Sequence, residues 1–319
     1  MNLEPDLECL MKLKLPLGRV RCVIDTDTFN EIDDQFAIVQ ALLSKDQLDL
    51  QAIYAAPFTN AKVATPGEGM ELSYDEILRL LIRLEVAAER LVFKGVCEYV
   101  GPEKVARDAA AVTDLIARAR ASSVDDPLYV IAIAAISNVA SAILSAPDIC
   151  DKIVVLWLGG HALDWPNAKE FNLRQDIGGA QVLFDCGVPL VLFPCRGVVS
   201  HLTTTVPEIE AHVEPHGAIG AFLAERFKCY SDDHVGWSKE IWDMAPVAWL
   251  IDQSWFDSVL VPTPILTDQA TWSVDRSRHV MRYVFHLYRD PILKDFFRKL
   301  RSHHLSDASG KLLAGCSDV

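Results

Sequence analysis

The stretch VIDTDTFNEIDDQFAIV, Val23–Val39, places four aspartates within ten residues, between two apolar segments. The apolar run from Arg19 to Ile24 predicts a short buried strand, and the residues from Asp34 to Leu43 predict a helix. Like charges repel one another at this spacing. Either the aspartates lie near the first turn of the helix, where its dipole favours anions, or a cation lies among them. The four residues are Asp25, Asp27, Asp33 and Asp34.

Apolar runs recur along the chain and alternate with segments of helical periodicity. Strands buried on both faces read as unbroken apolar runs, and their alternation with helices implies right-handed crossovers between parallel strands. We therefore predict an α/β fold with a mostly parallel, doubly wound central sheet and helices on both faces. Further strands are expected at Leu48–Ala55, Leu91–Phe93, 128–134, 152–160 and 188–194. Further helices are expected at Tyr74–Glu85, Ala106–Ala121, 136–144, 177–187 and 290–300.

The chain has no internal repeat and no clear linker, so a single domain is expected over residues 1–319. Its core is expected roughly at 19–300. Residues 203–242 are more polar and less periodic, and we interpret them as a helical insertion over the site. The small and polar residues at 302–319 predict a partly ordered surface tail.

Composition excludes several classes of partner. The formal charge of −14 argues against nucleic acid, because phosphate binding needs clustered Lys and Arg. No apolar run reaches the roughly 20 residues that cross a bilayer, and the N-terminus does not read as a signal peptide. The eight cysteines are scattered and form no C-x-x-C pair, so we expect a reducing, cytoplasmic location without zinc.

Ligands of doubly wound sheets bind outside the carboxyl ends of the strands. The acidic cluster follows the first predicted strand, AISN follows LYVIAIA, and GGH follows IVVLWL. One interpretation of the cluster is structural: Asn30 caps the helix and Asp33 and Asp34 occupy its first turn. The other is a Ca²⁺ site, because Ca²⁺ takes six to eight oxygen ligands, mostly carboxylates and carbonyls.

The segment DTDTFNEIDD resembles the metal-binding signature of the inosine/uridine-preferring nucleoside hydrolase family, D-x-D-x-x-x-D-D. Here five residues, Thr28–Ile32, separate Asp27 from Asp33, where the family usually has three. The longer spacer indicates that the chain resembles a divergent member of this family. Together the matching motifs extend over roughly three quarters of the chain. The other motifs are AAISNVASAI, LWLGGH, EFNLRQD, FDCGVPLVLFP and WDMAPVAWL.

The resemblance implies a role for each residue of the cluster. A Ca²⁺ ion would hold the ribose diol and a water molecule, and Asp33 would deprotonate that water. Asp25 would support the other carboxylates from behind. The implied ligands are the carboxylates of Asp27, Asp34 and Asp243 and the backbone carbonyl of Ser137.

The resemblance also implies the reaction, which is cleavage of the N-glycosidic bond of a ribonucleoside or a related N-riboside. Glu170 and Asn172 match residues that hydrogen-bond the ribose hydroxyls, and Asn167 is a weaker candidate. Taken without the resemblance, these residues read as a solvated loop before a helix.

The match is weaker at the expected nucleobase side. Where the family commonly has a His that helps to protonate the leaving base, this chain has Trp242, whose indole stacks on rings but donates no acidic proton. His161, which follows LGG, is either the proton donor or a hydrogen-bonded structural histidine. His201 is a weaker candidate.

These departures leave alternative functions open. The chain could be an altered or non-catalytic family member that binds a sugar-like ligand through Ca²⁺, or a hydrolase of another ribosylated or glycosylated compound. The expected partner is a small nucleoside or riboside, with no nucleic acid and no membrane. The resemblance also implies a possible homodimer or homotetramer.

Overall fold

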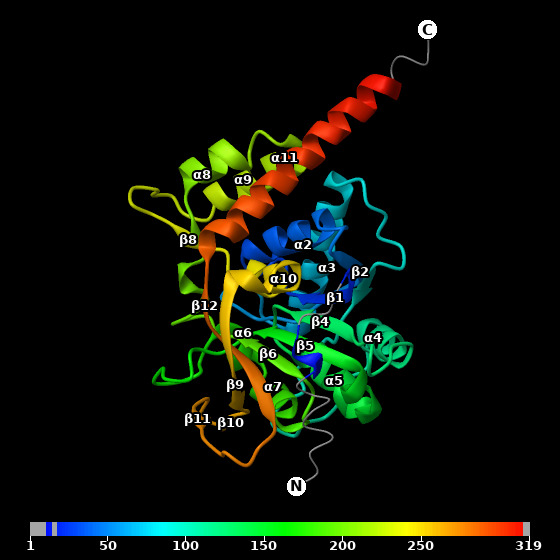
Figure 1. Cartoon of the computed structure of the whole chain (residues 1–319), viewed down its shortest axis with the longest axis vertical. Coiled ribbons are helices and arrows are strands. Elements are labelled where there is room, and N and C mark those ends of the chain that lie inside the picture. Colours follow the sequence, from blue (N-terminus) through cyan, green and yellow to red (C-terminus); the bar gives the residue numbers. More distant parts are fainter. Residues whose placement is uncertain (1–10, 15–17, 315–319) are drawn as a thin grey trace.

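The structure is a computed structural model that describes residues 11–14 and 18–314. An eight-stranded sheet crosses the molecule in the order β3-β2-β1-β4-β5-β6-β12-β9 (Figure 1). All neighbouring strands are parallel except the antiparallel pair β12 and β9. This confirms the predicted mostly parallel sheet. Its strands are β1 (Val20–Thr26), β2 (Leu48–Ala55), β3 (Val92–Lys94), β4 (Leu128–Ala132), β5 (Ile153–Leu158), β6 (Leu190–Phe193), β9 (Phe256–Pro262) and β12 (Val280–Leu287).

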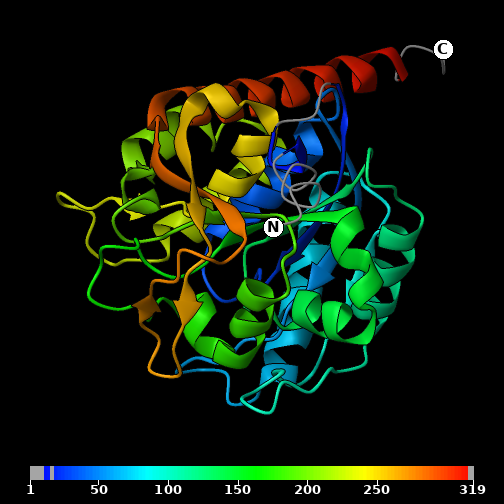
Figure 2. The same ribbon diagram turned by 60° about the horizontal axis from the view of Figure 1, so that its bottom comes forward.

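Helices cover both faces of the sheet (Figure 2). Successive residues of β1 show why: Cys22 and Ile24 pack into one apolar cluster, and Val23 between them packs into the other. Helices α2, α10 and α11 contribute to the first cluster, and α4, α5 and α7 to the second. The helices are α2 (Asp33–Leu43), α3 (Pro66–Arg83), α4 (Ala110–Arg120), α5 (Ser137–Ser145), α6 (Phe171–Gln175), α7 (Ile177–Asp185), α8 (Val206–His212), α9 (Gly217–Lys228), α10 (Met244–Ile251) and α11 (Arg289–Ala314).

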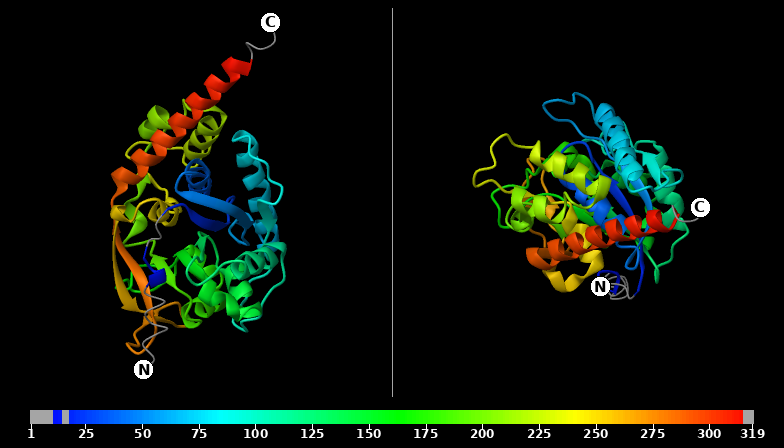
Figure 3. Two further views of the ribbon diagram at one scale, coloured as in Figure 1. Left: turned by 45° about the vertical axis from the view of Figure 1, so that its right-hand side comes forward. Right: turned by 90° about the horizontal axis from the view of Figure 1, so that it is seen from above.

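Several elements differ from the sequence-based expectation. Helix α3 begins at Pro66, eight residues before the predicted start, because Thr65 caps it by accepting a 3.2 Å hydrogen bond from the Glu68 amide. Residues 302–314 of the tail expected as partly ordered surface continue α11, which extends away from the body (Figure 3), and residues 315–319 lie outside the described part of the chain. Strands β9 and β12 were not predicted, because their polar and apolar residues mix at the partly exposed sheet edge.

The polar segment 203–242 contains helices α8 and α9 between two short strands. Its ends meet in an antiparallel pair that joins Thr203 to Glu240, so the segment returns to its starting point. The expected bounds of the insertion remain a prediction. None of the helices of the described residues is both long and apolar enough to span a membrane. The short elements are β7 (Thr203–Thr204), β8 (Lys239–Glu240), β10 (Ile265–Leu266), β11 (Trp272–Ser273), and the 3₁₀ turns Pro147–Lys152, Val199–His201 and Gln253–Trp255.

Candidate metal centre and substrate cavity

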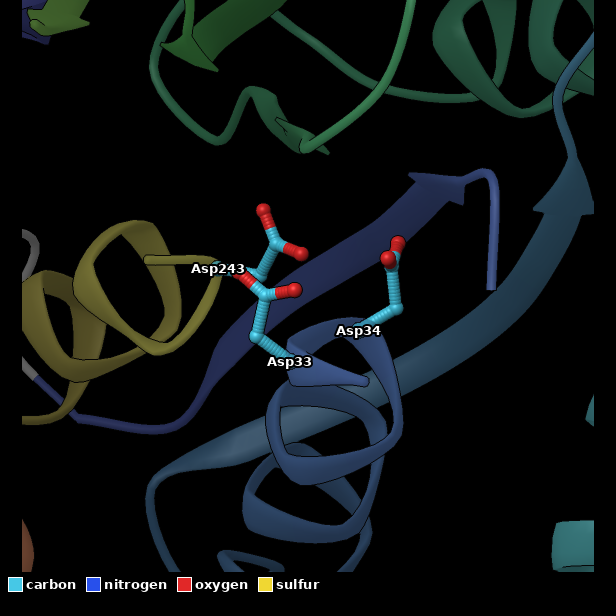
Figure 4. Close-up of side chains that lie close together, drawn as sticks. All are labelled: Asp33, Asp34 and Asp243. Carbon is cyan, nitrogen blue, oxygen red and sulfur yellow. The ribbon is translucent and has the colours of Figure 1, made fainter. Parts of the chain in front are cut away.

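Three buried carboxylates meet at the carboxyl end of the sheet. Asp33 and Asp34 lie in the first turn of α2, and Asp243 directly precedes α10 (Figure 4). Each of the three offers a carboxylate oxygen within 4.8 Å of the other two. Helix α2 has no side-chain cap; Asn30 instead accepts a 3.2 Å hydrogen bond from the Asn60 side chain. The proposed capping role of Asn30 is therefore wrong.

The carboxylates face a cavity of about 390 Å³, which we name the acidic cavity. Asp27, at the end of β1, lines this cavity but lies outside the group of three carboxylates. The walls contain most of the residues that the sequence predicted for the site. They are Asp27, Asn30, Glu31, Asp33, Asp34, Ile133, Leu158, His161, Trp165, Asn167, Lys169, Glu170, Phe171, Asn172, Arg174, Cys195, Arg196, Trp242 and Asp243.

Burial and mutual repulsion make these carboxyls poor acids. Burial raises the pKa of Asp34 to about 8, and the charge of Asp33 adds to the effect. Burial also raises the pKa of Asp33 to about 6, although the Lys239 ammonium opposes the rise. The Asp27 carboxylate oxygen Oδ2 is buried and has no hydrogen-bond partner. Several buried carboxylate oxygens close together, one of them without a hydrogen-bond partner, are the ligands that a hard cation such as Ca²⁺ or Mg²⁺ prefers.

Asp25 lies behind the cluster and does not line the cavity. Its carboxylate accepts a 2.7 Å hydrogen bond from the side-chain nitrogen of Asn138. The side-chain oxygen of Asn138 in turn accepts a 2.8 Å hydrogen bond from the Val96 backbone amide. Burial raises the pKa of Asp25 to about 7. This position fits the supporting role that the sequence suggested.

Ser137 lies at the start of α5, beside the cavity rather than on its walls. It is the first residue of α5, where a backbone carbonyl points along the helix toward its C-terminus. Its hydroxyl donates a 2.6 Å hydrogen bond to Asp176, and Ser137 is absent from the walls of the cavity. Ile133, the first residue after β4, does line the cavity. The Ser137 carbonyl therefore stays a predicted ligand, and the Ile133 carbonyl is a second candidate.

Glu170 and Asn172 lie together on the wall at the start of α6. Glu170 caps this helix, because its carboxylate accepts hydrogen bonds from the backbone amides of Asn172, at 2.8 Å, and Leu173, at 3.1 Å. The carboxylate also accepts a 3.0 Å hydrogen bond from the Gly160 backbone amide. Burial raises its pKa to about 7. The Asn172 side-chain nitrogen donates to the Leu158 carbonyl at 3.1 Å, which orients its amide. Backbone bonds thus fix both side chains.

The expected proton donor and ring-stacking residue also lie on the walls. His161 is 7% exposed, its Nδ1 has no hydrogen-bond partner, and its ring meets Trp165 edge-on at 6.3 Å. Burial, followed by the charge of Arg196, lowers the pKa of His161. Trp242 and Asn167 line the same cavity. His201 does not: its Nε2 lies 2.7 Å from the Leu287 carbonyl, so it is structural.

Sequence reasoning missed a tether between the acidic loop and the polar segment. Lys239 of β8 is 6% exposed and donates a 2.6 Å hydrogen bond to the Glu31 carboxylate. Cys195 and Arg196 were missed as well, although they follow the end of β6. Applying the strand-end rule to that strand would have found them.

A second hollow of about 620 Å³, which we name the aromatic cavity, adjoins the first. Trp165 and Trp242 line both cavities, as do Glu31 and Arg196. The other walls of the aromatic cavity come mainly from the end of the polar segment. They are Gly197, Ser200, Tyr230, Trp237, Ser238, Lys239 and Glu240.

Curated relatives are bacterial pyrimidine-specific ribonucleoside hydrolases named RihA. The Klebsiella pneumoniae (strain 342) protein is 28% identical over 46% of this chain and 49% of its own length. The Escherichia coli (strain K12 / MC4100 / BW2952) protein is 27% identical over 71% of this chain and 78% of its own length. The chain thus spans about half the length of the first matched relatives and more of others.

Solved structures share the fold. A plant nucleoside hydrolase, PpNRh1, has a TM-score of 0.70 at 18% identity and covers 88% of this chain and 99% of its own. A purine-preferring ribonucleoside hydrolase from Gardnerella vaginalis has a TM-score of 0.70 at 19% identity. The match covers 89% of this chain and 99% of that protein. The sequence profile of the inosine-uridine preferring nucleoside hydrolases matches residues 22–286. The chain belongs to this family.

Proposed function

We propose that this protein is a Ca²⁺-dependent hydrolase that cleaves the N-glycosidic bond of a ribonucleoside or a related N-riboside. The observation that supports it best is the convergence of three buried carboxylates in a cavity that the predicted ribose-binding residues also line. Membership of the nucleoside hydrolase family supports the reaction class.

The proposed ion would be held by the carboxylates of Asp27, Asp34 and Asp243. The carbonyl of Ser137 or that of Ile133, which lines the cavity at the end of β4, is proposed as a further oxygen ligand. When bound, a divalent cation supplies charge that offsets the repulsion among the carboxylates and makes a nearby water more acidic. Asp25 braces this set through Asn138.

Asp33 is proposed to take a proton from the attacking water. Its carboxylate belongs to the cluster, but its neighbour across the loop is the Lys239 ammonium, whose charge keeps its pKa below that of Asp34. A general base works best when its pKa lies near the working pH, and a value of about 6 meets that condition.

The remaining wall residues are proposed to bind the two halves of the substrate. Glu170 and Asn172, with Asn167 beside them, would hold the ribose hydroxyls and stabilise the positive charge that develops on the ring. Trp242 would stack on the leaving group. His161 would contact it too, and its lowered pKa means that its imidazole is neutral at pH 7.

The test is a hydrolysis panel. Purified protein with Ca²⁺ is incubated with purine, pyrimidine and pyridinium ribosides, and released base and reducing sugar are measured. Release that stops with chelator and returns with Ca²⁺ is the expected result. If no riboside is cleaved but ribose derivatives bind in the presence of Ca²⁺, the protein is a sugar-binding member of the family and the hydrolase proposal fails.

A further inference from the structure

The leaving-group side of the cavity is built from rings. Trp165 and Trp242 line both the acidic and the aromatic cavity, so they mark the junction between them. Beyond this junction, Tyr230 and Trp237 continue the aromatic walls. A flat heteroaromatic group that leaves the ribose here would meet indole faces, which attract cations as well as stack on rings.

Among the described residues, the same junction lacks a strong acid that could protonate the leaving group. Trp242 directly precedes the metal-cluster residue Asp243, and its indole N–H is not an acid. His161 also lies on the wall, and burial, followed by the charge of Arg196, lowers its pKa and so disfavours the imidazolium form. The phenol of Tyr230 lies beyond the junction, and burial raises its pKa, which makes it a weaker acid. A neutral base such as uracil or hypoxanthine leaves as an anion unless it is protonated, so this site suits it poorly.

We propose that the preferred substrates are N-ribosides of cationic heteroaromatic rings, such as pyridinium ribosides, whose leaving group needs no proton. Water attacks C1′ and gives its proton to Asp33, while the C1′–N bond breaks. The bonding electron pair goes to the ring nitrogen and neutralises its positive charge. The products are ribose, a neutral heteroaromatic base and one proton. This inference rests on the proposed hydrolase function and names its substrate class.

The charge of the walls permits a cation. Seven acidic and four basic side chains line the two cavities, so a divalent cation at the cluster reduces the excess of three negative charges to one. Lys239 is already paired with Glu31 at 2.6 Å. Arg196 works against a bound cation, so the preference must come from the ring faces of Trp165 and Trp242.

The first experiment measures recognition without turnover. Dissociation constants are measured by calorimetry for 1-methylnicotinamide, which is cationic, and nicotinamide, its neutral counterpart, with Ca²⁺ and saturating ribose present. We expect the cation to bind about tenfold more tightly, as for a desolvated cation–π contact. Trp242→Leu should abolish that difference, whereas Phe285→Leu, at an exposed ring that lines neither cavity, should preserve it. Equal binding of the two compounds by the unaltered protein would overturn the inference.

The second experiment separates proton supply from stacking. Rate enhancements over the uncatalysed reaction are measured for nicotinamide riboside, uridine and inosine, which removes differences in intrinsic bond strength. We expect the pyridinium riboside to show the largest enhancement. Trp242→His should raise kcat/KM for uridine and inosine by about 100-fold, the usual contribution of general acid catalysis. The same change should leave or lower the value for nicotinamide riboside.

Trp242→Phe is the matched control, since it keeps a ring but adds no proton donor. It should leave uridine and inosine hydrolysis unimproved. Larger enhancements for uridine or inosine in the unaltered protein would overturn the substrate class while supporting the hydrolase function. If none of the three ribosides is cleaved, both proposals fail. Ca²⁺-dependent thermal stabilisation of each variant confirms that it is folded.

Discussion

Lys239 and Glu31 form an ion pair of 2.6 Å, although 208 positions separate them in the sequence. Glu31 belongs to the five-residue spacer Thr28–Ile32, which is two residues longer than the family signature, and Lys239 belongs to β8. The pair therefore holds the lengthened loop against the polar segment. The loop is also held to helix α2, because the side-chain nitrogen of Gln35 donates a 2.8 Å hydrogen bond to the Thr28 carbonyl.

Replacing Lys239 with Met should loosen this loop. The Lys239 side chain is buried, but Glu31 is partly exposed, so we expect a loss of about 1–2 kcal/mol in the free energy of unfolding. We also expect kcat/KM to fall about tenfold, since Asp33 follows the loop directly. Urea unfolding and steady-state kinetics measure the two effects. Lys228→Met, which removes surface pairs with Glu210 and Glu214, is the control. Equal behaviour of the two variants would contradict the tether.

Asp33→Asn should separate proton transfer from ion binding. If Asp33 is the general base, kcat should fall by about 100-fold or more, as for removal of a positioned base. Ca²⁺ affinity, measured by calorimetry, should fall far less than in Asp243→Asn, because Asp243 is a proposed ligand. Unchanged turnover would exclude Asp33 as the base, and loss of Ca²⁺ binding in this variant would reassign it as a ligand.

The stability of the ion-free protein should fall as pH rises. Folding raises the pKa of Asp33 to about 6, Asp25 to about 7 and Asp34 to about 8. Unfolded aspartate has a pKa of about 3.9, so the folded state binds more protons between that value and pH 8. Deprotonation therefore favours the unfolded state throughout this window.

Thermal melting in chelator should thus give a lower Tm at pH 8 than at pH 5, and Ca²⁺ should raise Tm more at pH 8. Asp34→Asn removes a carboxyl whose pKa is raised to about 8 and should flatten the pH dependence. A Tm that rises from pH 5 to pH 8 without Ca²⁺ would contradict the crowding of these carboxyls.

Asn138→Leu should destabilise the protein without touching the cavity. The substitution leaves the buried Asp25 carboxylate and the Val96 amide without their partner. Each buried group left without a hydrogen-bond partner costs about 1–3 kcal/mol, so a total loss of roughly 2–6 kcal/mol in the free energy of unfolding is expected from urea unfolding. Asn167→Leu, on the cavity wall, provides the comparison and should cost less than about 1 kcal/mol. Similar losses of unfolding free energy in both variants would contradict a supporting role of the hydrogen bond between Asn138 and Asp25.

The sheet and the acidic cluster were predictable because each depends on local sequence. The parallel strands read as unbroken apolar runs, and Asp33 and Asp34 are neighbours in the chain. The motif WDMAP also located Asp243. Cys195 and Arg196 follow the end of β6 and were not predicted, although the strand-end rule covers that strand as well.

Other features were beyond sequence reasoning for physical reasons. The backbone carbonyl that faces a cavity depends on where a strand ends, so Ile133 had no signal in the sequence. The Lys239–Glu31 pair needs the return of the polar segment through β7 and β8, a non-local event without a local pattern. Strands β9 and β12 are partly exposed and lack a clean alternation.

The distance along the chain between Asp34 and Asp243 has a consequence for biosynthesis. A ribosome makes the acidic loop early, but the third carboxylate emerges only after roughly three quarters of the chain has been synthesised. Nascent chains that end before Trp242 therefore lack a complete ion site. Calcium captured by this cluster would report completion of the fold, since early fragments hold the acidic loop but not its distant partner.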